Sequence, residues 1–284
     1  MPAEPPIRPI ALTIAGFDPS SGAGITADLK TFSAYGIYGV ACISALTVQS
    51  TLGVRAVEPL PAILVHQTLE CLAEDVALSG IKIGMLGSSV VASEVASFLS
   101  AQAGTVARER IVLDPVLRSS SGASLLDPDG VRVILEALLP RVGWITPNTV
   151  ELAILTGADS TAAAGLGHEQ VPAAAARLKE IAARQGNVEL NVVVTGGHLG
   201  RPDDFLLAAS GEPGWLPGER IVTNATHGTG CAFSSALLCG LISGLGSLAA
   251  VAGAKDYVTE ALRSAYPVGK GKGPMNNLYR FHPI

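Results

Sequence analysis

The segment Asn224–Cys231, which reads Asn-Ala-Thr-His-Gly-Thr-Gly-Cys, combines polar side chains with two glycines and opens into the apolar run Ala232–Leu245. We expect this run to form a buried helix, whose first turn leaves backbone N–H groups free and carries partial positive charge. Gly228 and Gly230 lack the Cβ atoms that would keep an anion away from these donors. The pattern predicts a cradle for phosphate, or for charge that develops during phosphate transfer.

Cys231 lies in the first turn of the same predicted helix. A helix N-terminus lowers the pKa of a thiol, so this location could make Cys231 a reactive thiolate. This leads to an alternative from another enzyme class, a cysteine hydrolase in which His227 activates Cys231. Such a hydrolase would work without a phosphate donor, which distinguishes it from a phosphotransferase.

Three oxygen-bearing side chains form a candidate cation site. Asp114 ends an apolar strand, while Asn148 and Glu151 lie at the start of a predicted helix. Residues three apart share one face of a helix, so Asn148 and Glu151 could hold Mg²⁺ together with Asp114, directly or through water. The same spacing is typical of a capping box, in which Asn148 is the N-cap and Glu151 reaches back to it. Spacing alone leaves both interpretations open.

A glycine-rich loop, Gly16–Gly24, follows the first apolar strand. It has neither the G-x-G-x-x-G pattern of dinucleotide-binding loops nor the G-x-x-x-x-G-K-[ST] pattern of P-loop kinases. The loop predicts close approach of a small ligand to the backbone, although Asp18 and Pro19 are equally typical of a plain turn. Gln49 follows the next strand, and its amide offers a donor beside an acceptor, which suits the edge of a heterocycle. A structural, hydrogen-bonded amide is the alternative.

Composition excludes several classes of function. The 284 residues carry a net charge of −5 with a pI near 5.5, which gives no long-range attraction to nucleic acid or anionic membranes. Ile221–Ala254 has no charged side chain, but the break at Ser243–Ser247 leaves an apolar helix too short for a bilayer. The four cysteines stand singly, as reduced cytosolic thiols do, and the N-terminus lacks the pattern of a signal peptide. We expect a soluble, cytoplasmic protein.

Short apolar runs alternate with longer helical patterns along the chain. The runs expected to form strands are Ile10–Ala15, Gly39–Leu46, Ile81–Gly84, Ile111–Asp114, Val142–Thr146 and Val192–Thr195. The helices expected between them are Ile25–Ala34, Ala62–Leu78, Ser89–Ala101, Asp127–Leu139 and Pro172–Gln185. The later elements are two strands joined by a turn, Phe205–Ala209 and Trp215–Val222, and two helices, Gly228–Ile242 and Leu248–Ala265.

This order predicts an α/β protein, a three-layer α/β/α sandwich around a mostly parallel sheet with an antiparallel C-terminal edge. Ligands of such sheets gather beyond the carboxyl ends of the strands. Polar and glycine residues concentrate there, in Gly16–Gly24, Thr47–Gly53, Met85–Ser88, Asp114–Ser121, Pro147–Glu151 and Thr195–His198. We expect one domain over residues 1–284, with residues 1–9 flexible.

Seven fragments of the chain carry a resemblance to a known family: Ala11–Gly16, Gly22–Phe32, Ala45–Gln49, Lys82–Met85, Asp114–Val116, Thr146–Glu151 and His227–Cys231. In order and spacing they resemble the hydroxymethylpyrimidine/phosphomethylpyrimidine kinases of thiamine biosynthesis, a branch of the ribokinase-like superfamily. The resemblance runs from Ile10 to about Asn277. It implies a ribokinase-like fold and ATP-dependent phosphorylation of 4-amino-5-hydroxymethyl-2-methylpyrimidine on its hydroxymethyl oxygen. Family members commonly phosphorylate the monophosphate again, to the diphosphate.

The resemblance also implies roles for single residues. Those that would line the pyrimidine pocket are Gly16, Ala23, Asp28, Gln49, Met85 and Val116, with Gln49 on the aminopyrimidine edge. Those implied for the nucleotide are Asp114, Thr195 and Lys255, and those for magnesium are Asp114 and Glu151, beside which the spacing places Asn148. The amides that would receive the transferring charge belong to Gly228, Thr229, Gly230 and Cys231.

Cys231 stands where sugar kinases of the superfamily have an aspartate base, and it would orient or deprotonate the substrate hydroxyl. Related kinases often form homodimers. The expected partners are therefore the pyrimidine, ATP with Mg²⁺ and a second copy of the chain, with no nucleic acid and no membrane.

The chain departs from the family pattern at three places. Phe17 stands where serine is usual, Ser21 where glycine is common, and Gly269–Pro274 where histidines are usual. Phe17 could reshape the pocket mouth, which would affect the second phosphorylation most. A pyridoxal or pyridoxine kinase of the same superfamily is therefore an alternative, since its substrate also carries a hydroxymethyl group on a heteroaromatic ring. A non-catalytic binding protein is another.

Overall fold

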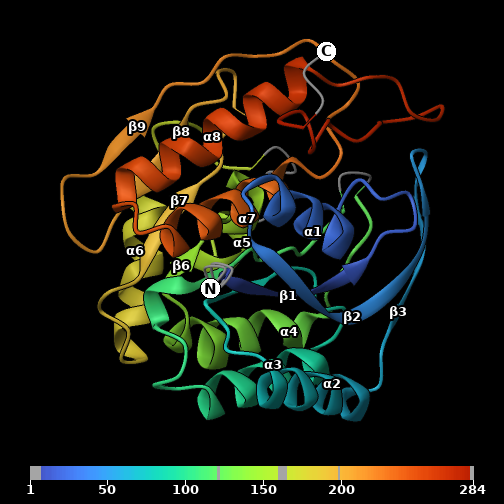
Figure 1. Ribbon diagram of the computed structural model, residues 1–284. Helices are drawn as coiled ribbons and strands as arrows, with labels where there is room; N and C mark the ends of the chain where they lie inside the picture. The colour runs from blue at the N-terminus through green and yellow to red at the C-terminus, as the bar shows by residue number, and fades with distance from the viewer. Residues whose placement is uncertain (1–7, 120–121, 159–164, 198, 282–284) are drawn as a thin grey trace, which may run out of the picture.

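Nine strands form one mixed sheet in the computed structural model, which describes residues 8–119, 122–158, 165–197 and 199–281 (Figure 1). The strands are β1 (Ile10–Phe17), β2 (Tyr38–Ser50), β3 (Gly53–Pro59), β4 (Gly80–Ile83), β5 (Ile111–Leu113), β6 (Trp144–Ile145), β7 (Asn191–Val194), β8 (Asp204–Leu207) and β9 (Gly214–Leu216). Their order across the sheet is β3-β2-β1-β4-β5-β6-β7-β8-β9.

The central strands β2, β1, β4, β5, β6 and β7 pair in parallel, whereas β8 pairs antiparallel with both β7 and β9. The predicted α/β class with an antiparallel C-terminal edge is therefore confirmed. A second antiparallel edge, β3 against β2, was not predicted.

Helices cover both faces of the sheet, as Figure 1 shows. Over one face lie α1 (Gly24–Ala34), α7 (Thr229–Ile242) and α8 (Ser247–Arg263), which share a core cluster with Ala11, Val112 and Val193 of the strands. Over the other lie α2 (Ala62–Asp75), α3 (Ser89–Ala101), α4 (Pro128–Val133), α5 (Thr149–Thr156) and α6 (Val171–Arg184), which share a cluster with Leu12 and Ile83. Strand side chains thus alternate between two apolar layers, as expected for a sheet buried on both faces.

Most element boundaries agree with the sequence pattern within a few residues. α3 spans Ser89–Ala101 as predicted, and Asp127 caps α4 by accepting a hydrogen bond from the Gly130 N–H. The helix predicted to run to Leu139 changes after Val133 into a π-helical turn, Ile134–Leu138. β6 and β9 are shorter than the predicted Val142–Thr146 and Trp215–Val222.

The prediction that the second strand ends at Leu46, with Thr47–Gly53 beyond its end, is wrong. β2 continues to Ser50, the chain turns at Thr51 and Leu52, and β3 returns as an edge strand. Alternation of exposed Val48 with half-buried Gln49 is typical of a strand that has one face in water. The consequence is that Gln49 is held by a hairpin, although the pairing register shifts between Val48 and Gln49.

Of the segment 1–9, expected to be flexible, residues 1–7 lie outside the described residues, as do residues 120–121 and 198 of the predicted strand-end segments. Within the described ranges, none of the helices combines the length and the hydrophobicity that a bilayer crossing requires.

Candidate active site

The predicted anion cradle lies at the start of α7. Gly228 is the N-cap with a positive φ of 81°, and no side chain caps the helix there, so its first N–H groups are available. A Cβ on Gly228 would lie 1.8 Å from the Gly22 carbonyl oxygen, so this close approach of two loops requires glycine. A Cβ on Gly230 would lie 3.8 Å from Asp114 Oδ2. The cradle and the strand-end carboxylate therefore face each other.

Asp114 and Glu151 form a buried acidic pair beyond β5 and at the start of α5. Burial raises the pKa of Asp114 to about 6, and the charges of Lys82 and Asp28 act on it in opposite directions. Burial also raises the pKa of Glu151 to about 8, and the negative charge of Asp114 adds to this shift. Ser234 Oγ donates a hydrogen bond to Asp114 Oδ2 (3.1 Å). With both groups ionised, the pair would carry more negative charge than its surroundings compensate, which is why it holds protons up to an unusually high pH.

Such a pair fits a magnesium ion that keeps most of its water ligands. Mg²⁺ is commonly bound through one or two carboxylates plus substrate phosphates, and Asp114 faces the anion cradle at Gly230. No group of three His, Cys, Asp or Glu side chains within metal-binding reach occurs among the described residues. Two carboxylates would suit an ion that takes its other ligands from water and from substrate phosphates.

Asn148 forms the capping box that the sequence left open as an alternative. Its Oδ1 accepts hydrogen bonds from the N–H groups of Val150 and Glu151, both at 2.9 Å, and Glu151 Oε2 accepts from the Asn148 N–H at 2.8 Å. Asn148 Oδ1 could bind magnesium only in competition with these two capping hydrogen bonds. Thr195 lies next to it, because the Thr195 N–H donates to the Pro147 carbonyl oxygen (3.0 Å).

Three residues predicted for the pyrimidine, Gly16, Met85 and Val116, gather near the ends of β1, β4 and β5. A Cβ on Gly16 would lie 2.3 Å from Met85 Cε, so the Met85 side chain covers the Gly16 backbone. Met85 also packs in a small cluster with Ala45, Leu125 and Val116. The structure thus brings Gly16, Met85 and Val116 together in an apolar corner near the Gly16–Gly24 loop.

The structure places Asp28 differently from the other predicted pocket residues. Its carboxylate is fully buried, with Oδ2 accepting from Thr13 Oγ1 (2.6 Å) and Lys82 Nζ (3.0 Å), and Oδ1 accepting from Ser235 Oγ (2.8 Å). Although burial opposes the charge of Lys82, the Asp28 carboxylate raises the pKa of that amine. Asp28 is thus engaged by protein groups on all sides. Sequence reasoning missed Lys82, whose signal is a single charge inside the apolar strand β4.

The buried Asp18 and the partly buried His227 form a second pair, which sequence reasoning missed. Asp18 accepts hydrogen bonds from the N–H groups of Ser20, Gly22 and Ala23, and His227 Nε2 lies 2.7 Å from its Oδ2. Burial opposes ionisation of Asp18, but the hydrogen bonds from His227 and Ser20 lower its pKa to about 2. Asp18 is therefore more than a turn former. It ties the glycine-rich loop to the segment before α7.

The prediction of a reactive Cys231 thiolate is wrong for this structure. Burial raises the pKa of the Cys231 thiol to about 12; the charge of Lys82 opposes this shift, and those of Asp114 and Asp28 add to it. Loss of water thus outweighs the helix N-terminus. The His227 ring is engaged by Asp18 and Gln49, with 3.1 Å between His227 Nε2 and Gln49 Nε2. The cysteine hydrolase alternative therefore lacks its thiolate, and Nε2 of its proposed base is already paired with Asp18.

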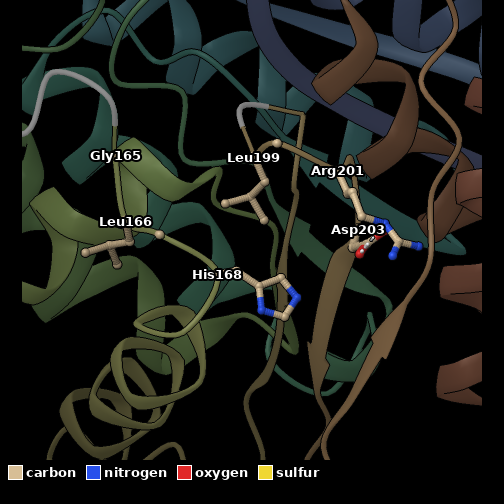
Figure 2. A pocket seen from close by; sticks show the side chains of 8 residues that line it. Gly165, Leu166, His168, Leu199, Arg201 and Asp203 are labelled. Atoms are coloured by element: carbon tan, nitrogen blue, oxygen red, sulfur yellow. Dashed lines mark ion pairs between the residues drawn. The ribbon is translucent and has the colours of Figure 1, made fainter.

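A cavity of about 500 Å³ opens beyond the end of β7, and its walls are Gly165, Leu166, Gly167, His168, Leu199, Gly200, Arg201 and Asp203. Figure 2 shows that these residues come from two segments, one before α6 and one after β7, with His168 between them and an Arg201–Asp203 ion pair on one side. The His168 ring stacks on Trp215, with 3.7 Å between ring centroids.

Lys255 on α8 lies beside the same region. Its Nζ donates to Asp204 Oδ2 (2.7 Å) and to the Pro202 carbonyl oxygen (2.8 Å), directly after the cavity wall residue Arg201. A second cavity, of about 450 Å³, includes Lys255 and Gly218 in its lining. Lys255 is therefore placed near both cavities but is already paired with a carboxylate.

Comparisons with known proteins agree with this geometry. The family model of phosphomethylpyrimidine kinase matches residues 18–276. The hydroxymethylpyrimidine/phosphomethylpyrimidine kinase of Rhizobium meliloti (strain 1021) is 39% identical over 96% of this chain and 98% of its own length. That of Haemophilus influenzae (strain ATCC 51907 / DSM 11121 / KW20 / Rd) is 38% identical over 94% of this chain and 95% of its own.

Of two similar solved structures, one has the higher sequence identity and the other the higher TM-score. The phosphomethylpyrimidine kinase of Clostridium difficile 630 has a TM-score of 0.73 and 34% identity, covering 90% of this chain and 100% of its own. The pyridoxal kinase of Staphylococcus aureus in complex with pyridoxal has a TM-score of 0.83 but 27% identity, covering 98% of this chain and 96% of its own. The ribokinase-like fold is confirmed, and the comparisons do not favour the pyridoxal kinase alternative. The chain belongs to the phosphomethylpyrimidine kinase family.

Proposed function

We propose that this protein transfers the γ-phosphoryl group of ATP to the hydroxymethyl oxygen of 4-amino-5-hydroxymethyl-2-methylpyrimidine, and then phosphorylates the monophosphate again, in thiamine biosynthesis. The observation that carries the proposal is the uncapped first turn of α7 facing Asp114, with a Gly230 Cβ position 3.8 Å from Asp114 Oδ2. The curated relatives named for both pyrimidine substrates support the choice of acceptor.

The cradle supplies most of what phosphoryl transfer needs. The transition state is loose, with charge spread over the oxygens of the transferring group, so alignment and charge stabilisation dominate. The N–H groups of Gly228, Thr229, Gly230 and Cys231 would donate to those oxygens. They are fixed by the helix and by the contact between Gly228 and Gly22, so they need no rearrangement during the reaction.

We assign Cys231 the task of orienting the substrate hydroxyl. A thiol with a pKa of about 12 stays protonated at neutral pH and is a poor general base. In a loose transition state the hydroxyl proton is not under strong pressure to leave early, so a strong base is not required. The hydroxyl would lie between the thiol and the cradle.

Asp114 and Glu151 would hold Mg²⁺ through water and the nucleotide phosphates, where the ion would neutralise phosphate charge. Lys82, fixed by Asp28 at 3.0 Å, lies close enough to favour the ionised form of Asp114. The protein thus keeps Asp114 able to lose its proton when a cation arrives.

We place the nucleotide along the ends of β6, β7 and β8. His168 lines the cavity with its ring stacked on Trp215, and Thr195, directly after β7, pairs with Asn148. Lys255 would contact the nucleotide after exchanging its partner Asp204. We also propose a cytoplasmic homodimer, for which light scattering of the purified protein is the test.

One coupled assay of ADP release tests the proposal. The pyrimidine alcohol, its monophosphate and pyridoxine are each supplied with ATP and Mg²⁺, and then without ATP. We expect turnover with both pyrimidines and little with pyridoxine. ADP release with pyridoxine alone would assign the pyridoxal branch instead, and no ADP release with any acceptor would leave a binding protein.

A further inference from the structure

His227 lies between two polar side chains from distant parts of the chain. Its Nε2 is 2.7 Å from Asp18 Oδ2 and 3.1 Å from Gln49 Nε2. Asp18 belongs to the glycine-rich loop after β1, and Gln49 to the β2–β3 hairpin. One ring nitrogen therefore contacts both side chains. Its protonation state limits which atom of the Gln49 amide can face His227 and which atom is left to face a ligand.

The position of the proton on this nitrogen follows from Asp18. The carboxylate accepts from three backbone N–H groups and from Ser20 Oγ, so it is held in its ionised, acceptor-only form. A ring nitrogen 2.7 Å from such a carboxylate has to carry hydrogen. His227 Nε2–H therefore donates to Asp18, whatever the state of Nδ1.

The same hydrogen determines what Gln49 can place beside His227. An amide NH₂ group facing an N–H would set two donors against each other, whereas the amide oxygen could accept from it. A half turn of the amide exchanges its oxygen and nitrogen with little change in shape. The hydrogen-bond pattern therefore favours the Gln49 carbonyl oxygen on the side of His227, and its NH₂ group on the opposite side.

We propose that His227, held by Asp18, is a positioning residue that fixes the Gln49 amide, so that Gln49 offers an N–H donor to the ligand. The ligand edge that this selects is a hydrogen-bond acceptor, such as an unprotonated ring nitrogen of an aromatic heterocycle. The inference rests on the proposed function, because it takes Gln49 as the residue that reads the pyrimidine edge.

The loop that carries Asp18 is itself fixed, which gives the pair a rigid base. Ser21 has a positive φ of 64°, a backbone conformation that costs a non-glycine residue energy, and Lys30 Nζ donates to both its carbonyl oxygen (2.7 Å) and its Oγ (2.9 Å). The contacts of Lys30 show how serine is tolerated at a backbone conformation that favours glycine. Asp18 is thus held from the loop side, and it holds His227 in turn.

The first experiment measures a ratio of dissociation constants. One ligand is the pyrimidine alcohol, and the other is an analogue in which CH replaces the ring nitrogen beside the amino group. We expect the wild type to prefer the pyrimidine by about tenfold to a hundredfold, as the loss of one buried hydrogen bond implies. His227→Leu should bring the ratio close to one. His227→Gln, whose amide can donate where Nε2–H does, should restore most of it.

The matched control is His66→Gln. His66 also pairs with a carboxylate, with 2.8 Å between its Nδ1 and Glu94 Oε1, but it lies on α2 at the surface. This variant should leave the ratio unchanged. An unchanged ratio in His227→Leu would overturn the inference, while absence of pyrimidine binding in the wild type would overturn the proposed function itself.

A second variant keeps the inference testable if His227→Leu does not fold. Gln49→Glu has the shape of glutamine but only acceptors when ionised. We expect it to lose at least as much pyrimidine affinity as Gln49→Leu, because a carboxylate oxygen would face the ring nitrogen. If Gln49→Glu binds the pyrimidine as the wild type does, the ligand donates to Gln49 and the inference is wrong.

Discussion

Two sets of buried carboxylates lie beyond the strand ends, and their surroundings shift their pKa values in opposite directions. Asp18 is surrounded by donors, and its pKa falls to about 2. Asp114 and Glu151 are about as buried but have fewer donors around them, and burial raises their pKa values to about 6 and about 8. The first carboxylate is a permanently charged part of the framework. The second pair is short of positive charge, which a ligand can supply.

The difference follows from the local backbone. Asp18 is followed by a glycine-rich loop whose N–H groups turn back onto it, which is possible because Gly22 and Gly24 permit the tight path. Asp114 follows a buried strand and receives Ser234 Oγ, while the nearby Lys82 is committed to Asp28. A buried acid with an elevated pKa in a cleft is a candidate functional group.

The largest effect that this comparison predicts is on turnover. Asp114→Asn should lower kcat by about 10²–10³-fold, because it removes the charge that organises the cation opposite the cradle. The fold should survive, since the neutral amide no longer requires burial of a charge. Steady-state kinetics and circular dichroism measure both. Asp129→Asn, at an exposed position of α4, is the control, and a near-normal kcat for Asp114→Asn would contradict the comparison.

A smaller effect is expected for the thiol beside the acidic pair. Cys231→Ala should lower kcat by about tenfold and leave ATP binding intact, if Cys231 only orients the hydroxyl. A loss near the upper end of the about 10²–10⁴-fold that general-base catalysis contributes would restore the base role. The measurement is kcat together with a nucleotide dissociation constant from calorimetry.

Removing the charge from Asp18 should act on stability more than on chemistry. Asp18→Asn should cost about 2 kcal/mol in the free energy of unfolding at pH 7, because several hydrogen bonds lose their charged acceptor. The folded-state pKa of Asp18 lies below its ordinary value of 3.8, so its contribution is present above pH 4 and is lost as pH falls toward 2. Denaturant unfolding of both proteins at pH 7 and pH 3 should show the difference shrinking. A constant difference would contradict the assignment.

The smallest effect has the opposite pH dependence. Glu151 and Asp114 have folded-state pKa values above their ordinary ones, so the folded chain holds more protons between about pH 4 and pH 8, and stability falls as pH rises through that window. Glu151→Gln should therefore be more stable than the wild type by about 1 kcal/mol at pH 9 and about equal at pH 4.

Magnesium binding gives a second test of the Asp114–Glu151 pair. Added Mg²⁺ should raise the melting temperature of the wild type at pH 9 more than at pH 5, since the ion competes with protons for the two carboxylates. Glu151→Gln should lose part of this response. An equal rise in melting temperature at both pH values would show that Mg²⁺ does not bind at the acidic pair.

The sequence indicated the parts of the site that are contiguous in the chain. The Gly228–Cys231 turn, the strand-end position of Asp114 and the Asn148–Glu151 spacing could each be interpreted from a few neighbouring residues. The Asp18–His227 pair spans 209 positions and the Lys82–Asp28 pair spans 54, so neither is visible without the sheet that brings them together. The prediction of a lowered Cys231 pKa was wrong for a related reason. The burial that raises this pKa depends on the packing of α1 and α7 around the thiol.

The β2–β3 hairpin was missed because its alternating pattern is short and ends in a glycine that also suits a loop. This mattered for function, since Gln49 is held by two paired strands. By contrast, the layer architecture was predictable, because helices on both faces leave the central strands apolar on both sides.

The contact between Gly22 and Gly228 has a practical consequence for engineering. Two backbone segments meet there with no room for even a methyl group, at 1.8 Å from a Gly228 Cβ position to the Gly22 carbonyl oxygen. Directed evolution toward larger acceptors should therefore keep both glycines and randomise the hairpin side chains and Phe17, where added or removed volume leaves the two loops joined.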